Sequence, residues 1–147
     1  MGFGNNPTEF TSLTVAGVPT MGMAGIPPTA GNVYFVSSLT GSAGGSGSAE
    51  DPLSTIALAY ALCTANRGDI VVCLAGHAET ISGAAGLALT KAGVIVQSIG
   101  AGNDRATLTF GTSTAATCTI SGASTQLLNF VGVCAIDALV SPFVISA

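Results

Sequence analysis

The stretch that decides the fold is DPLSTIALAYALCTANRGDIVVCLAGHAETI, residues 51–81. Asp51 followed by Pro52 is typical of a helix start, because Asp caps the first turn and Pro tolerates the first helical position. The apolar side chains that follow share one helical stripe: Leu53, Ile56, Tyr60 and Cys63. Arg67 and Gly68 are typical of a helix end. We predict a helix over 52–66.

Short apolar segments separated by small and polar turns precede and follow this helix. We predict strands at 32–38, 69–75, 78–81, 93–99, 106–110, 117–121, 127–133 and 142–146. The main apolar strands near 70, 94, 118 and 143 recur about every 24 residues, which is typical of a solenoid of β-coils. Residues expected to face inward or to pack between coils are Ile70, Val72, Leu74, Val94, Val96, Ile120 and Phe130. The segment LTGSAGGSGSAED, residues 39–51, has nothing that would order it and lacks the Lys of a phosphate-binding loop.

Charged residues make up only 7% of the 147-residue chain, against roughly 25% in an ordinary soluble domain. No apolar run approaches the length of a transmembrane helix. With three basic residues and a net charge of −4, the chain has no basic surface for nucleic acid or for an anionic membrane. A surface with so few charges must be hydrated by small polar groups or covered by protein. We therefore expect a subunit of an assembly, with one domain at 32–147.

Residues 1–31 are predicted to form an extended arm. The arm has four prolines, six glycines and one charge, and only 10–18 resembles a short strand. Its apolar side chains are expected to contact another subunit, with a disordered tail as the alternative. They are Phe3, Phe10, Leu13, Val15, Val18, Met21, Met23 and Ile26.

The chain start lacks the basic and apolar regions of a secretory signal, so we expect assembly in a reducing cytoplasm. The cysteines, Cys63, Cys73, Cys118 and Cys134, are widely spaced in apolar contexts and form no zinc-binding pattern. Small buried side chains are the favoured interpretation, and a Cys73–Cys118 or Cys118–Cys134 bridge is the alternative.

A strand, a Gly/Ser loop, an amphipathic helix and then Gly68-Asp69 before an apolar strand resemble the opening of right-handed parallel β-helix proteins of the pectin-lyase-like type. The resemblance implies an all-β fold: a right-handed parallel β-helix whose N-terminal end is capped by the helix. The phrase GHAETI, residues 76–81, and the arm sequence LTVAGVPTMG, residues 13–22, are similar to virion proteins of tailed bacteriophages. Pectin-lyase-like enzymes have many more coils than this chain can form.

The sequence offers few candidates for catalysis. Asp69 and Glu79 are the best pair of carboxylates, although Asp69 is also typical of a turn. His77, the single histidine, could form an acid–base pair with Glu79. The alternatives for His77 are a turn residue bonded to carbonyls or a surface residue at an oligomer contact. We predict no metal or cofactor site.

Three further polar features have simple structural interpretations. Asp104 and Arg105 are predicted to form a local ion pair in a turn. Lys91 is predicted to be a solvated charge in another turn. Six threonines could line one face that binds glycan or ice, or could simply be outward strand residues. They are Thr107, Thr109, Thr112, Thr114, Thr117 and Thr119.

The sequence therefore predicts a non-enzymatic virion component of a tailed bacteriophage that decorates or cements the capsid or forms a fibre base. Its expected partners are a major capsid or tail protein and its own copies, in a homotrimer. The alternatives are a polysaccharide lyase or hydrolase of the tailspike type, or its N-terminal fragment, and a glycan-binding β-helix.

Overall fold

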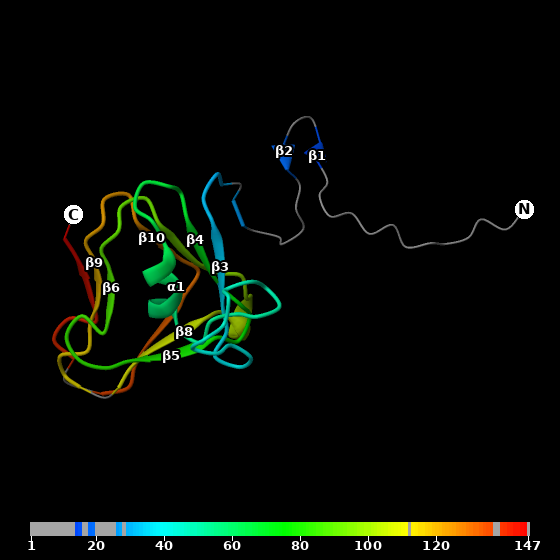
Figure 1. Ribbon diagram of the computed structural model, residues 1–147. Helices are drawn as coiled ribbons and strands as arrows, with labels where there is room; N and C mark the ends of the chain where they lie inside the picture. Colours follow the sequence, from blue (N-terminus) through cyan, green and yellow to red (C-terminus); the bar gives the residue numbers. More distant parts are fainter. Residues whose placement is uncertain are drawn as a thin grey trace, which may run out of the picture.

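The computed structural model describes residues 14–15, 18–19, 26–27, 29–111, 113–136 and 139–146 (Figure 1). Near the N-terminus, β1 (Thr14–Val15) and β2 (Val18–Pro19) pair in antiparallel fashion. The remaining elements are β3 (Val33–Val36), α1 (Ile56–Leu62), β4 (Ile70–Cys73), β5 (Ala78–Ile81), β6 (Leu87–Leu89), β7 (Ile95–Ser98), the 3₁₀ turn η1 (Gly102–Asp104), β8 (Thr107–Phe110), β9 (Cys118–Ile120), β10 (Gln126–Leu128), β11 (Val131–Cys134) and β12 (Phe143–Ile145).

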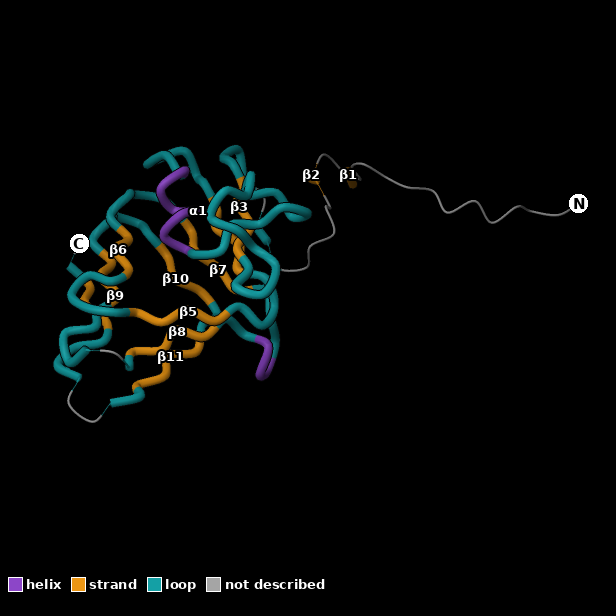
Figure 2. The backbone as a smooth tube through the Cα atoms, turned by 60° about the horizontal axis from the view of Figure 1, so that its bottom comes forward, coloured by secondary structure: helices purple, strands orange, loops and turns teal. Residues whose placement is uncertain are grey.

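The strands from β3 onward form three sheets in which all neighbours are parallel. The first sheet has the order β10-β7-β4-β3, the second β11-β8-β5 and the third β12-β9-β6. From β4 onward the chain thus passes through the three sheets in the same order three times. We call β4–β6, β7–β9 and β10–β12 the first, second and third coils. Figure 2 shows β5, β8 and β11 stacked in this succession.

The coils differ in length, unlike the regular recurrence that the sequence suggested. In the first sheet Ile70 pairs with Ile95, and Ile95 pairs with Gln126, so the second coil is longer than the first. In the third sheet Cys118 pairs with Phe143. The apolar strands near 70 and 94 are therefore neighbours in one sheet, and those near 118 and 143 are neighbours in another. The apparent regular period therefore combines strands of two different sheets, and these strands do not all stack on one another.

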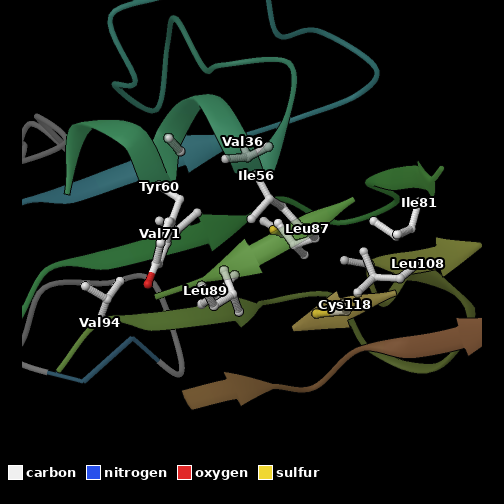
Figure 3. Close-up of a cluster of buried hydrophobic side chains, with 14 of the residues drawn as sticks. Val36, Ile56, Tyr60, Val71, Ile81, Leu87, Leu89, Val94, Leu108 and Cys118 are labelled. Atoms are coloured by element: carbon white, nitrogen blue, oxygen red, sulfur yellow. The ribbon is translucent and has the colours of Figure 1, made fainter. Parts of the chain in front are cut away.

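The hydrophobic core lies between the three sheets and α1 (Figure 3). Side chains alternate along each strand, so Val71 and Cys73 belong to the core cluster while Ile70 and Val72 are buried on the opposite face of β4. The predicted inward residues are fully buried at Ile70, Val72, Val94 and Val96 and partly buried at Leu74, Ile120 and Phe130. Burial of these positions is thus confirmed, completely for four and partly for three. Val94 and Val96 belong to the core cluster, whereas the inward orientation is wrong for Ile70 and Val72, which are buried on the opposite face of β4.

Helix α1 is shorter than predicted. It spans Ile56–Leu62, and its N-cap is Thr55, whose hydroxyl accepts a hydrogen bond from Leu58 N at 3.3 Å. Burial of the predicted stripe is confirmed for Leu53, Ile56, Tyr60 and Cys63, but only Ile56 and Tyr60 lie within α1. The predicted start at residue 52 is wrong, since the backbone of Leu53 pairs with β3 instead of entering the helix.

The glycine-serine segment 39–51 is ordered, contrary to the prediction. Gly47 O accepts from Phe35 N at 2.8 Å, and Leu53 bonds the backbone of Phe35 and Ser37 at 2.9 Å each. The carboxylate of Asp51 accepts from Ser46 N at 2.7 Å and holds the loop closed. The segment therefore covers the free edge of β3, which would otherwise be an unpaired strand edge.

Two strand predictions need correction, one in the last coil and one in the third sheet. The apolar segment 127–133 is two strands, β10 and β11, separated at Asn129, which has a φ of 62°. Asn tolerates this left-handed conformation better than most residues. Its side-chain amide also donates to Ser98 O at 2.9 Å and Gly100 O at 2.8 Å, which fixes the corner. Strand β6 (Leu87–Leu89) was not predicted, because three residues are too few for a clear pattern.

Candidate functional site

The N-terminus of α1 rests on a side chain from the first coil. Glu79 lies on β5, and its Oε2 atom accepts a hydrogen bond from Ile56 N at 3.0 Å. The same oxygen lies 3.3 Å from Nε2 of His77. Free N–H groups at a helix start favour a carboxylate partner. Glu79 therefore joins α1 to the second sheet.

His77 is buried, with 1% of its surface exposed, so its interpretation as a surface residue at an oligomer contact is wrong. Its ring contacts Glu79, and its Nδ1 atom is buried without a hydrogen-bond partner among the described residues. The side chain of Glu79 is 15% exposed. The pair that the sequence offered for acid–base chemistry is thus enclosed between α1 and the first coil.

The C-terminus of α1 is held by Lys91. Its Nζ atom donates to the carbonyl oxygens of Tyr60 and Ala61 at 2.8 Å and of Cys63 at 2.7 Å, and lies 5.5 Å from the centre of the Tyr60 ring. The last carbonyls of a helix lack internal partners and favour a cation. The prediction of a solvated turn charge for Lys91 is therefore wrong. Lys91 and these carbonyls lie far apart in the sequence, so no local spacing indicated the contact.

Asp69 fixes the start of the first coil. Its side chain is fully buried and accepts hydrogen bonds from Asn32 N at 2.8 Å, Thr64 N at 2.6 Å, and two atoms of Arg67 at 2.7 Å. Its bonds with the Arg67 guanidinium lower the pKa of Asp69 to about 2. The role is structural, and Asp69 shares no hydrogen-bond partner with Glu79 in the described part of the chain. The structure gives this pair of carboxylates no common site.

Two further polar predictions concern the pair Asp104 and Arg105 and the six threonines. Asp104 and Arg105 form no ion pair among the residues described here; Arg105 Nε instead donates to Gly102 O at 3.1 Å. The six threonines do not line one face. Thr107 and Thr109 lie on the outer face of β8 in the second sheet, whereas Thr119 lies on β9 in the third. Thr114 and Thr117 lie in the segment before β9, and Thr112 is outside the described residues.

All four cysteines are free thiols, so neither of the two alternative bridges is present. Cys63, Cys73 and Cys118 are buried, as expected of small apolar side chains, and burial raises the pKa of Cys63 and Cys118 to about 11. Burial also raises the pKa of Cys73. The interpretation as a buried side chain is wrong for Cys134, which is exposed on the edge strand β11. Because the thiolate is the nucleophilic form, the three buried thiols are not reactive nucleophiles at neutral pH.

The arm residues named above fall mostly outside the described part of the chain: Phe3, Phe10, Leu13, Met21 and Met23. Val15 and Val18 belong to β1 and β2, whose backbones pair, and Ile26 is half-buried. A subunit contact of the arm stays a prediction. Thr29, which the prediction assigns to the arm, donates its hydroxyl to Gly68 O just before the first coil.

The most unusual surface of the described molecule is its last coil. Six large apolar side chains of the third coil and its connections are exposed: Leu128 (39%), Val133 (39%), Val140 (86%), Phe143 (40%), Val144 (37%) and Ile145 (75%). Strands β10, β11 and β12 are each an edge of their sheet. We call these three strands, with Val140, the open end. In the described part of the chain no helix covers its inner side, whereas α1 lies at the opposite end.

The sequence carried one signal for this surface that strand patterns alone do not reveal. Asp137 is the sole charged residue after Arg105. Edge strands of sheets usually carry charges that prevent pairing with other chains. The strands after Arg105 therefore lack the charges that usually protect strand edges.

No family model matches the chain, and neither a curated protein nor a solved structure matches it. Within the described ranges, no helix is long and apolar enough to cross a membrane. The same ranges contain no group of three or more His, Cys, Asp or Glu side chains arranged to hold a metal ion.

Proposed function

We propose that the protein is a structural subunit that joins a larger assembly through its open end. The single observation that carries this proposal is the exposure of six large apolar side chains on the last coil, whose three strands each have a strand neighbour on one side only among the described residues. Large exposed apolar patches on a soluble domain usually mark contacts with other proteins. The resemblance to tailed-phage proteins makes the specific proposal a virion component that decorates or cements the capsid or forms a fibre base.

We propose further that the coils form a right-handed parallel β-helix. Three parallel sheets entered three times in the same order support this arrangement. Connections between parallel strands of one sheet are right-handed in nearly all proteins, which supports the hand. In this arrangement α1 would cap the N-terminal end, consistent with its contacts to β3, β4 and β6.

A structural role also agrees with the use of the charged side chains. Glu79 and Lys91 hold the two ends of α1, and Asp69 holds the start of the first coil. The candidates for acid–base chemistry are therefore committed to contacts within the fold. The expected partners are a major capsid or tail protein and further copies of the chain, in a trimer assembled in the host cytoplasm.

The proposal is tested by asking whether the chain is part of a particle. Cells are infected with the phage whose genome encodes the chain, and the phage particles are purified by density gradient. The proteins of the purified particles are then quantified by mass spectrometry. We expect the chain in a fixed ratio to the major capsid or tail protein. Its absence from purified particles would contradict the virion role.

The arm prediction is tested on the same particles with a variant that lacks residues 1–25. The deletion stops there because Thr29 contacts Gly68. We expect the variant to fold, judged by protection of its buried thiols, and to be lost from the particle. If it remains at full occupancy, the contact is made by the coils alone.

The polysaccharide-degrading alternative is tested on the purified chain by incubation with bacterial surface polysaccharides. Cleavage that is lost in Glu79→Gln, with thiol protection unchanged, would favour the enzyme over the structural subunit. Binding of an intact polysaccharide without cleavage would instead favour the glycan-binding alternative, with the outer face of β8 as the first surface to examine.

A further inference from the structure

We propose that the outer face of the first sheet, which points away from the core, is the docking surface for the chain's own N-terminal segment. This segment, which we call the strap, crosses the face just before β3. The inference goes beyond the proposed function, because it concerns a surface other than the open end. The strap consists of the described residues that precede Asn32: Ile26, Pro27, Thr29, Ala30 and Gly31.

The outer face of the first sheet is apolar although it lies outside the core. The strand register places eight side chains on it in two rows. The rows are Val33, Ile70, Ile95, Gln126 and Phe35, Val72, Gln97, Leu128. Six of these eight side chains are apolar and none is charged. A contiguous apolar surface of this kind usually contacts other protein segments.

Two residues on this face are buried more completely than the sheet itself explains. Ile70 and Val72 on β4 are 0% exposed. Strand β4 has a strand neighbour on each side, and so have β8 and β9. Yet the outward residues of those two strands, Thr107, Thr109 and Thr119, are only half-buried. A segment outside the sheet must therefore cover β4.

The cover reaches the next strand and ends before the last one. The side-chain oxygen of Gln97, which lies beside Val72 in the register, is buried. The residues Ile95 and Gln97 are each half-buried as a whole, and Leu128 on β10 is 39% exposed. The covering segment is thus centred on β4, near the N-terminal end of the coils.

The strap lies at this place. The hydroxyl of Thr29 donates to Gly68 O, just ahead of β4. Ile26 and Pro27 are half-buried although they belong to no strand or helix. Figures 1 and 2 both show the chain joining the body beside β3, on the side away from α1. Since α1 packs on the core side of the first sheet, the strap enters on the outer side.

No other described segment beside β3 and β4 is suited to cover Ile70 and Val72. In the glycine-serine segment 39–51 the only buried residue is Gly47, which lies against Tyr34 on the core side. Residues 64–67 after α1 and the three residues of η1 are exposed. Ile26 and Pro27 are therefore the apolar side chains that remain to cover β4.

Docking of the strap gives the arm a fixed starting point on the body. The chain before Ile26 would leave from the outer face of the first sheet, and not from a free joint at β3. If the arm contacts another subunit, as predicted, the tie to that subunit passes into the first coil through Ile26 and Thr29. The first sheet is then the side of the body that lies nearest to that subunit.

The test measures access to the outer face with an introduced thiol. Val72→Cys is made in the full chain, alone and combined with Ile26→Asp, which places a charge in the strap. Ala30→Asp is the matched control, because Ala30 belongs to the same segment but is exposed. Each protein reacts with a thiol reagent, and the labelled positions are identified by mass spectrometry of peptides.

We expect the thiol of Val72→Cys to be as unreactive as Cys73, which is buried on the core side of the same strand. Ile26→Asp should raise its rate of labelling about tenfold, because a charge at a half-buried apolar position favours local opening. Ala30→Asp should leave the rate unchanged. Labelling of Cys63, Cys73 and Cys118 would reveal unfolding, in which case Ile70→Cys replaces Val72→Cys and the milder Ile26→Ser replaces Ile26→Asp.

Fast labelling of Val72→Cys without a second substitution, or protection that no change at Ile26 alters, would overturn the proposal. Protection that is lost on dilution would overturn it as well, and would assign the cover to a second copy. These results leave the virion role untouched, since that role depends on the presence of the chain in phage particles. Absence from the particles with the strap docked would contradict the virion role alone.

Discussion

Removing the ammonium of Lys91 is the most direct test of how α1 is held on the first coil. In Lys91→Met the apolar stem is retained, but the carbonyls of Tyr60, Ala61 and Cys63 lose their common donor. A hydrogen bond to a charged group contributes about 1.5–3 kcal/mol. The three bonds share one ammonium at a helix end that water can partly reach, so they do not add.

We therefore expect a loss of about 2 kcal/mol in the free energy of unfolding, including the interaction of the ammonium with the helix dipole. For a domain of this size the loss corresponds to a decrease of about 8 °C in Tm. The assay is denaturant unfolding followed by circular dichroism, with Cm and the slope m fitted separately.

Arg105→Met is the matched control for this experiment. Arg105 is also a long basic side chain, but it makes one exposed hydrogen bond, to Gly102 O. We expect its unfolding free energy to change by less than about 0.5 kcal/mol. If Lys91→Met and Arg105→Met are equally stable, the three carbonyl contacts do not hold the helix and the reasoning is refuted.

Three further predictions concern the first two coils. The pKa of Asp69 is lower in the folded state than in the unfolded state. The contribution of Asp69 to stability is therefore complete above about pH 4 and is lost as the pH falls toward about 2. In acid-unfolding curves, Asp69→Asn should show a weaker dependence of stability on pH over this range. Glu79→Ala should destabilise by about 1–2 kcal/mol through loss of the acceptor for Ile56 N, with Glu79→Gln milder because it keeps an acceptor, as measured by urea unfolding. Gly100→Ala should lower Tm strongly, since its Cβ would lie 1.8 Å from a backbone oxygen, whereas Gly44→Ala, with open space around it, should not.

The sequence allowed prediction of elements whose apolar pattern is local. The stripe from Leu53 to Cys63 identified α1, and β-branched runs identified β4 and β7. It could not identify β6, because three residues give no periodicity. It also misplaced the coil boundaries, since the turns between strands have different lengths and only the register of the sheets fixes which strands stack.

The site depended on contacts that no local pattern encodes. Lys91 and Tyr60 are separated by 31 positions in the chain, and Glu79 and Ile56 by 23. From the sequence Lys91 is predicted to be a turn charge and Glu79 a candidate catalytic carboxylate, because no spacing rule identifies a charged side chain that caps a helix from another element. Only the structure shows that Glu79 and Lys91 both form hydrogen bonds with the backbone at the two ends of α1.

The distribution of charge along the chain nevertheless carries information about the two ends of the coil. Nine of the ten charged residues precede residue 106, and three of them, Asp69, Glu79 and Lys91, hold the first coil and its helix. A helix end needs such partners because its N–H and C=O groups have none within the helix. A strand edge can be completed by another strand without any charge. The end that carries α1 is therefore rich in charge, whereas the strands of the last coil, β10, β11 and β12, contain no charged residue.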